Sequence, residues 1–315
     1  MAEGEASREQ PAGGPLGRVV VAGGTGLVGR ALVKTLLARG SEVVVLTRRP
    51  GTALLPPGAK AQGWEHPAKL LEGADAVFNL AGEGIADRRW TPRRKQVLLQ
   101  SRVGPTEELV AALAACTQRP AVLVNASAIG YYGACDETPV SEFSPAGTGF
   151  LPEVCQAWEA AALRAVDLGV RVVLPRIGVV LAEQGGALPK MARPVRWYAG
   201  TCLGQGRQGL SWIHLRDLVA LLVEAAVNPA WDGPVNATAP EPVSHAVFMA
   251  LLAKRLHRPL LPIPGFLTYA GVRLALGELG RDLLLRGAFV YPGQAEALDF
   301  PFRFPSPEAA LEDLL

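Results

Sequence analysis

Residues 18–29 read Arg18-Val-Val-Val-Ala-Gly-Gly-Thr-Gly-Leu-Val-Gly29, an apolar run followed at once by a cluster of glycines. The run at 19–22 is typical of a strand that is buried on both faces. Apolar residues then recur at helical spacing from Leu27 to Leu36, and Gly40 stands where a C-terminal helix cap belongs. A second apolar run at 43–46 predicts another strand. Strand, glycine turn, helix and strand together indicate a βαβ unit.

The glycines of this turn have the spacing Gly23-x-x-Gly26-x-x-Gly29. Gly23 permits a strained turn, Gly26 lets a pyrophosphate approach the backbone, and Gly29 lets the helix pack closely on the strand. The free N–H groups at the helix start then face the phosphates, helped by the helix dipole. The turn therefore predicts a dinucleotide site, with a purely structural glycine turn as the alternative.

The end of the second strand indicates which dinucleotide is bound. It reads Thr47-Arg48-Arg49, and residues 43–50 contain no Asp or Glu to accept the ribose 2′-hydroxyl of NAD. An arginine there suits a 2′-phosphate, which it can hold by charge and two-pronged hydrogen bonding. We therefore predict NADP(H) as the cofactor; the alternative is that Arg48 and Arg49 are ordinary solvated charges.

The rest of the chain continues the alternation of strands and helices. Apolar runs predict strands at 75–82, 121–125 and 171–174, and helical patterns lie at 93–115 and 152–166. This order predicts an α/β fold, a Rossmann doubly wound parallel sheet. After Leu181 the pattern changes to a loop-rich stretch at 185–211, a helix at 217–226, a strand at 235–236 and an apolar, helical end.

We expect three parts along the chain. Residues 1–17 form a flexible tail, 18–182 an NADP-binding Rossmann domain, and 183–315 a smaller C-terminal substrate lobe that is interleaved with the first. Ligand is expected at the carboxyl ends of the strands, where the strand order reverses.

Composition excludes several classes of protein. With 49% hydrophobic residues, 19% charged residues and a net charge of +2, the chain is globular and unsuited to nucleic acid. The four cysteines and four histidines are scattered, so we predict no metal site. No run approaches the ~20 apolar residues of a membrane span. The first 17 residues resemble no targeting segment, so we expect a cytoplasmic protein, with an organelle interior left open.

Several further motifs carry a resemblance to a known family. They are Asn79-Leu-Ala-Gly-Glu83, Ser127-Ala-Ile-Gly-Tyr-Tyr-Gly133, Trp158-Glu-Ala-Ala161, Arg176-Ile-Gly-Val-Val-Leu181, Gly204-Gln-Gly-Arg-Gln208 and Asn236-Ala-Thr-Ala-Pro240. With them the chain resembles an atypical extended member of the short-chain dehydrogenase/reductase superfamily, of the NAD-dependent epimerase/dehydratase type. It is most similar to epimerase family proteins once linked by name to a cell-division inhibitor.

This resemblance implies a set of cofactor contacts. Thr25, Gly26, Leu27 and Val28 would line the pyrophosphate, and Thr47 and Arg48 would take the adenosine ribose phosphate. Leu80, Ala81 and Gly82 would lie along the nicotinamide-side ribose, Arg102 could reach the cofactor, and Val180 would sit near the nicotinamide. Core packing is the alternative for Leu80, Ala81 and Val180.

The same resemblance shows where this sequence departs from the catalytic pattern of the family. Active members carry a Tyr-x-x-x-Lys pair on one helical face, with the Tyr as acid or base and the Lys lowering its pKa. Here Cys155 stands in the Tyr position and Glu159 in the Lys position. The usual mechanism therefore cannot be carried over. The serine partner also departs, because Ser127 falls one residue early and Ala128 takes its place.

Substitutes for the missing pair lie nearby in the sequence. Tyr131 or Tyr132 could serve as the acid, and Glu159 could act as a base where burial raises its pKa. We therefore name Tyr131, Ser127 and Glu159 as the catalytic candidates. Cys155 is interpreted as an inert buried thiol rather than a nucleophile.

Two classes of function follow. The first is an NADP-dependent oxidoreductase or epimerase-like enzyme acting on a small polar substrate. The second is a catalytically inactive NADP(H)-binding scaffold or accessory subunit, and a homodimer or larger protein complex is left open. The basic residues of 185–211 indicate either an anionic-substrate pocket under a lid or a solvated loop: Lys190, Arg193, Arg196 and Arg207.

Overall fold

A parallel sheet forms the centre of the structure, a computed structural model that describes residues 16–135 and 138–315. The strand order is β3-β2-β1-β4-β5-β8-β12, so the order reverses beside β1. The strands are β1 (Arg18–Ala22), β2 (Glu42–Leu46), β3 (Lys60–Gln62), β4 (Ala76–Asn79), β5 (Val122–Asn125), β8 (Arg171–Ile177) and β12 (Gly233–Ala237). The short β6 (Ser127–Ala128) pairs with β8 beyond the end of β5.

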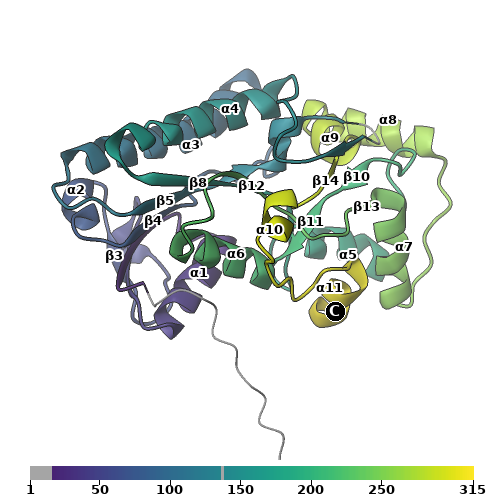
Figure 1. The fold of residues 1–315 in the computed structure, drawn as a ribbon. Coiled ribbons are helices and arrows are strands. Elements are labelled where there is room, and N and C mark those ends of the chain that lie inside the picture. The colour runs from purple at the N-terminus through teal and green to yellow at the C-terminus, as the bar shows by residue number, and fades with distance from the viewer. Residues whose placement is uncertain (1–15, 136–137) are drawn as a thin grey trace, which may run out of the picture.

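Helices cover both faces of this sheet, as the apolar strands require. Helices α1 (Leu27–Ala38) and α6 (Leu215–Val227) lie on one face, and α3 (Pro92–Ala115) and α4 (Phe150–Leu163) lie on the other (Figure 1). The predicted Rossmann doubly wound α/β fold is thereby confirmed.

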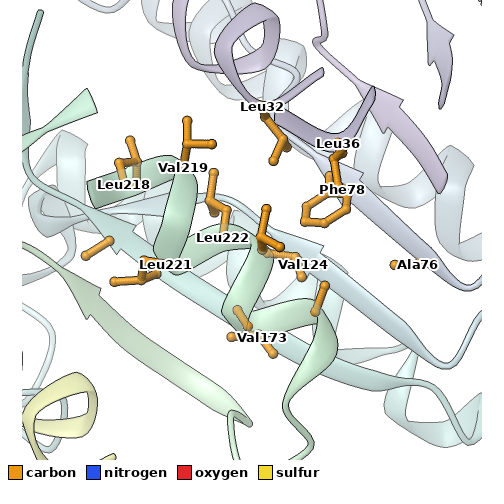
Figure 2. Packing of buried hydrophobic residues seen from close by; sticks show 14 of the residues in the cluster. Leu32, Leu36, Ala76, Phe78, Val124, Val173, Leu218, Val219, Leu221 and Leu222 are labelled. Atoms are coloured by element: carbon orange, nitrogen blue, oxygen red, sulfur yellow. The ribbon is translucent and has the colours of Figure 1, made fainter. Parts of the chain in front are cut away.

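Alternate residues of the strands enter two separate cores. Val19 and Val21 pack with Leu32 of α1 and Leu222 of α6, whereas Val20 and Ala22 pack with residues of α3 and α4. Figure 2 shows the first core, in which Phe78 and Val124 of the sheet face the leucines of both helices. The period of two along β1 therefore fills both sides of the sheet.

The chain after β8 builds a second lobe around its own apolar core. Trp212, Phe248, Leu188 and Leu311 lie in this core. The elements are β9 (Val179–Leu181), α5 (Leu188–Arg196), β10 (Gly209–Leu210), β11 (Trp212–His214), β13 (Val243–Ser244), α7 (His245–Arg255), α8 (Gly265–Leu276), α9 (Glu278–Leu284), β14 (Phe289–Val290) and α11 (Pro307–Leu314). Helix α10 (Gly293–Ala297) packs on β12 and adds Ala295 to the first core. The remaining short elements are α2 (Pro67–Leu71), β7 (Pro139–Val140) and the 3₁₀ turns η1 (Pro50–Thr52), η2 (Ile129–Tyr132) and η3 (Val166–Leu168).

Helix α5 forms inside the stretch that the sequence predicted as loop-rich. Leu188, Ala192 and Val195 are buried on one side of it, so tertiary packing stabilises a helix despite Pro194. Pro189 stands in the first turn, where proline is tolerated. The domain boundaries stay a prediction. The expected tail falls outside the described residues except for Leu16 and Gly17, and Leu16 accepts a hydrogen bond from Ser41.

The start of α6 holds the C-terminal segment in place. His214 is the N-cap, and its Nδ1 accepts the N–H of Arg216 at 3.0 Å. Its ring stacks on Phe304 with centroids 3.8 Å apart, and Nε2 lies 3.3 Å from the Asp313 carboxylate. Asp217 accepts the backbone N–H groups of Arg303 and Phe304. His214 and Asp217 therefore hold the C-terminal residues 303–313 against the start of α6.

This anchor predicts a pH dependence of stability. Burial lowers the pKa of His214 to about 4 even though Asp313 opposes the shift. The pKa of His214 in the folded state lies below its unfolded value of about 6.5. The contribution of the neutral imidazole to the free energy of unfolding is therefore complete above pH ~6.5 and is lost as the pH falls toward 4. The loss amounts to on the order of 3 kcal/mol at pH ~4.

Urea unfolding of the native chain and of His214→Asn, which keeps an N-cap acceptor, measures the effect. We expect the variant to show the shallower decline in stability between pH ~6.5 and ~4. Parallel pH profiles for the two proteins would contradict this role of His214.

Candidate functional site

The glycine turn between β1 and α1 has no room for a side chain at Gly23 or at Gly29. Gly23 has a φ of +81°, and a Cβ there would lie 2.4 Å from the carbonyl oxygen of Leu80. A Cβ on Gly29 would lie 2.2 Å from the carbonyl oxygen of Gly23. The close packing of the turn thus requires glycine at both positions. Gly26 is the exposed N-cap of α1 and provides no side-chain cap, so the first N–H groups of the helix are open to an anion.

Three segments that are distant in the sequence converge on this turn. The backbone of Leu80 and Ala81 touches Gly23, and the side chain of Leu27 lies against Gly185 and Gly186. Gly186 in turn approaches the carbonyl of Val180, which lies on β9. Thr25 is exposed, and Leu27 and Val28 are half-buried. The structure therefore brings the predicted pyrophosphate and nicotinamide-side residues to one edge of the sheet.

A buried polar network shapes the loop that follows β4. Asn79 donates from Nδ2 to Asn125 at 2.6 Å and to Thr106 at 2.8 Å, and its Oδ1 accepts the N–H of Ala81. Arg102 of α3 donates to the carbonyl of Glu83 at 3.0 Å and packs against Gly82. The groups that fix residues 80–83 therefore come from β4, β5 and α3.

Thr47 and Arg48 follow β2, directly beside the turn, because Ala22 of β1 pairs with Leu46. Arg48 is exposed, and it forms no ion pair within residues 16–135 and 138–315. Its charge lies near Glu83 and lowers the pKa of that carboxyl, after the larger effect of Arg94. Arg48 is thus a cation at the sheet edge that is available to a ligand.

The catalytic candidates gather around a buried arginine that the sequence reasoning did not select. Arg176 of β8 donates through Nε and Nη2 to the two oxygens of Glu159, both at 2.8 Å. Ser127 donates to the same carboxylate at 2.6 Å. Glu159 therefore has its oxygens occupied by Arg176 and Ser127, an arrangement that suits a structural counter-ion better than a base.

The two tyrosines differ in their surroundings. Tyr132 is buried, donates to Asn236 at 2.6 Å and accepts from Arg176 at 3.0 Å. Burial raises the pKa of Tyr132 to about 12, although Arg176 opposes the shift. Tyr131 is half-buried, and its ring lies under the Arg176 guanidinium, 3.5 Å from the ring centroid. No hydrogen bond to the Tyr131 hydroxyl forms within the described part of the chain, so this phenol is the one open to a ligand.

Cys155, which stands in the position of the family's tyrosine, is not poised for proton transfer. Its Sγ is buried and contacts the carbonyl of Ala128 at 3.6 Å. Burial and then the Glu159 charge raise the pKa of the Cys155 thiol to about 12. A thiol that holds its proton so firmly is a poor acid or nucleophile at neutral pH.

A signal for Arg176 was present in the sequence. It interrupts the apolar run Val172-Val173-Leu174-Pro175, and a charge in a buried strand needs a partner. The partner, Glu159, lies on another element, and only the fold brings the two together.

No helix within residues 16–135 and 138–315 is long and apolar enough to cross a membrane. Over the same residues, no three His, Cys, Asp or Glu side chains are grouped so that they could hold a metal ion.

A parallel sheet with an open helix N-terminus at its reversal point defines the class of Rossmann-type nucleotide-binding proteins. A model of the NAD dependent epimerase/dehydratase family matches residues 19–236, and a domain of unknown function (DUF1731) matches residues 268–314. The chain belongs to the NAD-dependent epimerase/dehydratase family.

Relatives agree with this assignment over nearly the whole chain. The chain is 40% identical to the chloroplastic epimerase family protein SDR39U1 homolog of Arabidopsis thaliana, over 94% of this chain and 86% of that one. It is 41% identical to the epimerase family protein Mb2239 of Mycobacterium bovis, over 90% and 93%.

Solved structures show the same fold. The human epimerase family protein SDR39U1 (isoform 2), solved with NADPH, superposes with a TM-score of 0.86 at 34% identity, covering 94% of this chain and 98% of that one. UDP-glucose 4-epimerase of Thermotoga maritima superposes with a TM-score of 0.72 at 16% identity, covering 94% and 97%. At that identity the second comparison shows the fold alone.

The buried ion pair predicts a large, asymmetric effect on stability. Glu159→Gln leaves the Arg176 charge without its counter-charge, so we expect the free energy of unfolding to fall by about 3–5 kcal/mol. The double variant Glu159→Leu/Arg176→Met should recover part of this loss, because it removes both charges.

Glu107→Gln is the matched control. It breaks the exposed Glu107–Arg164 pair, which joins α3 to the end of α4, and should cost no more than about 1 kcal/mol. Urea denaturation measures all three variants. Equal losses in the free energy of unfolding for Glu159→Gln and Glu107→Gln would show that burial does not determine how much the Glu159–Arg176 pair matters for stability.

Proposed function

We propose that this chain is an NADP(H)-dependent oxidoreductase or epimerase-like enzyme in which Tyr131 is the proton donor and Arg176 the cation that positions its ring. The observation that carries the proposal is the Arg176 guanidinium, 3.5 Å from the centroid of the Tyr131 ring. A guanidinium stacked over the face of an aromatic ring fixes the position of that ring, so Arg176 holds the Tyr131 hydroxyl in one place.

The network around Arg176 supports this division of roles. Glu159 holds the guanidinium by two hydrogen bonds, Ser127 holds Glu159, and Tyr132 accepts from the remaining Nη1. We assign Glu159 and Ser127 as positioning residues, since they act through Arg176 and not on a substrate. The nicotinamide, when bound, would supply or accept the hydride, while the protein orients it and moves the proton.

NADP(H) is the preferred cofactor in this proposal. Gly23, Thr25, Gly26, Leu27, Val28 and Gly29 would hold the pyrophosphate, and Thr47 and Arg48 the 2′-phosphate. Leu80, Ala81, Gly82, Arg102 and Val180 would line the nicotinamide half. The human relative solved with NADPH supports this choice.

The proposal also covers the kind of substrate and the place where it binds. The substrate would be small and polar and would lie between the Rossmann domain and the lobe formed by residues 183–315. A cytoplasmic location and the subgroup named after a cell-division inhibitor stay predictions.

One observation favours the second candidate, an NADP(H)-binding scaffold or accessory subunit without turnover. The two positions of the family's tyrosine and lysine hold a thiol with a raised pKa and a carboxylate that is bound to Arg176. Such a protein would retain the cofactor for stability, because a bound ligand stabilises the folded state by mass action.

The role of Arg48 is tested by cofactor binding. Arg48→Ala should weaken NADPH binding roughly 10- to 100-fold and leave NADH binding unchanged, because it removes a charge-assisted contact to the 2′-phosphate alone. Arg49→Ala, one residue further along, is the control and should have a smaller effect. Fluorescence titration measures both cofactors, and an unchanged ratio of affinities in Arg48→Ala would refute the role.

The role of Tyr131 is tested by turnover. NADPH consumption is measured with a panel of small carbonyl compounds, and Tyr131→Phe should lower kcat by roughly 10²–10⁴-fold because it removes the acid. Tyr132→Phe should lower stability while leaving most of the activity, since that hydroxyl faces Asn236 and Arg176. Wild-type protein that binds NADPH tightly but turns over no compound of the panel would favour the scaffold.

A further inference from the structure

Helix α8 directs its apolar side chains away from the protein. Of its residues only Thr268 is buried, whereas Phe266 is 72% and Leu274 is 83% exposed. Phe266, Ala270 and Leu274 recur every four residues and so share one side of the helix, with Leu267 beside them. A helix on the surface of a soluble protein normally packs its apolar stripe against the core. The apolar stripe of α8 has no such partner among the described residues, which marks it as an interaction surface.

Neighbouring segments extend the same exposed surface. The N–H of Leu261 donates to the carbonyl of Gly200 at 2.7 Å, and the Arg258 guanidinium lies 4.6 Å from the Tyr198 ring. Thr268 accepts the N–H of Gly204, which holds α8 against that segment. We call this surface the α8 face and define it by its exposed apolar residues: Trp197, Tyr198, Leu261, Ile263, Phe266, Leu267, Tyr269 and Leu274.

The α8 face lies far from the nucleotide-binding strands. Figure 1 shows α8, α7 and the connection between them at one end of the molecule, with β3 at the opposite end. A ligand on this face would therefore leave the glycine turn accessible.

The charge around the α8 face is predominantly positive. The adjoining α9 carries Glu278 and Asp282, and both are ion-paired, Glu278 with Lys95 and Asp282 with Arg281. Residues 184–216 and 242–277 contain no Asp or Glu. They carry cations that form no ion pair within residues 16–135 and 138–315: Lys190, Arg193, Arg196, Lys254, Arg258 and Arg273. The face is thus apolar and aromatic, with a cationic surround.

We propose that the α8 face binds the surface of an anionic lipid bilayer. An apolar helix stripe can enter the boundary between headgroups and acyl chains, and Trp and Tyr favour that boundary. Lys and Arg next to it are attracted to anionic headgroups and strengthen binding roughly fivefold per charge. All three features occur together on this face, which would make the protein a peripheral membrane protein that keeps its nucleotide site in water.

A second copy of the chain fits the face less well. A two-fold contact places the same patch on both partners, and here it would bring the cations of one copy close to those of the other: Arg193, Arg196, Arg258 and Arg273. Like charges at close range oppose such a contact, whereas anionic headgroups neutralise them.

Sedimentation of the full chain with vesicles tests the proposal. We expect binding to vesicles of phosphatidylcholine with phosphatidylglycerol, at least about tenfold weaker binding to phosphatidylcholine alone, and weakening by salt. The fluorescence of Trp197, which is 78% exposed, should shift to the blue on binding, and Trp197→Phe should lose that shift.

Matched variants locate the binding surface. Phe266→Glu/Leu274→Glu and Arg193→Glu/Arg196→Glu should each reduce vesicle binding at least about tenfold. Leu54→Glu/Leu163→Glu, which also charges two exposed leucines but outside the α8 face, should bind vesicles as the native chain does. Unchanged NADPH affinity in every variant would show that the fold is intact.

Two results would overturn the proposal. One is vesicle binding that is absent, or equal for neutral and anionic lipid. The other is concentration-dependent dimerisation without vesicle binding, abolished by Phe266→Glu/Leu274→Glu, which would assign the α8 face to a second copy.

Discussion

A guanidinium buried at the carboxyl end of β8 has to be neutralised, and this requirement organises the catalytic half of the site. Arg176 is 3% exposed, so its charge is stable there only with a partner of opposite charge and a full set of acceptors. Glu159 supplies the charge, and Tyr132 and the carbonyl of Glu142 accept the remaining hydrogen bonds. The arginine thereby joins β8, α4, η2 and the loop before α4, and it holds the ring of Tyr131 by stacking.

The nucleotide half rests on a constraint of a different kind, which is the lack of space. Gly23 and Gly29 meet backbone atoms at distances that exclude any Cβ, so the turn is rigid and its amides keep one direction. The loop after β4 and the glycines at 185–186 close on this turn from both lobes. The buried amides of Asn79 and Asn125 stabilise the first of these two contacts. Steric exclusion thus orders the backbone of the glycine turn, while a buried ion pair orders the candidate acid.

The two lobes differ in how completely they bury their apolar residues. The sheet covers both of its faces with helices, and the strands of its centre are inaccessible to solvent. The second lobe has a core of its own but leaves α8 uncovered on the side away from Thr268. The uncovered helix lies at the end of the molecule opposite β3, so contacts made there would leave the glycine turn accessible (Figure 1).

The sequence by itself determined the nucleotide-binding half. The apolar period of β1 and β2, the glycine spacing and Arg48 after the second strand are local signals, since each depends on residues within a few positions. They sufficed to predict the βαβ unit, the Rossmann sheet and the edge where a cofactor would lie. Only the tertiary structure decided the partner of Arg176, because Glu159 is 17 residues away on another element and shares no sequence pattern with it. The tertiary structure also decided that α5 is a helix, because the second lobe buries Leu188, Ala192 and Val195. It likewise decided that α8 is exposed. The sequence of an apolar helix looks the same whether the helix is covered or exposed, since its exposure depends on which other elements pack against it.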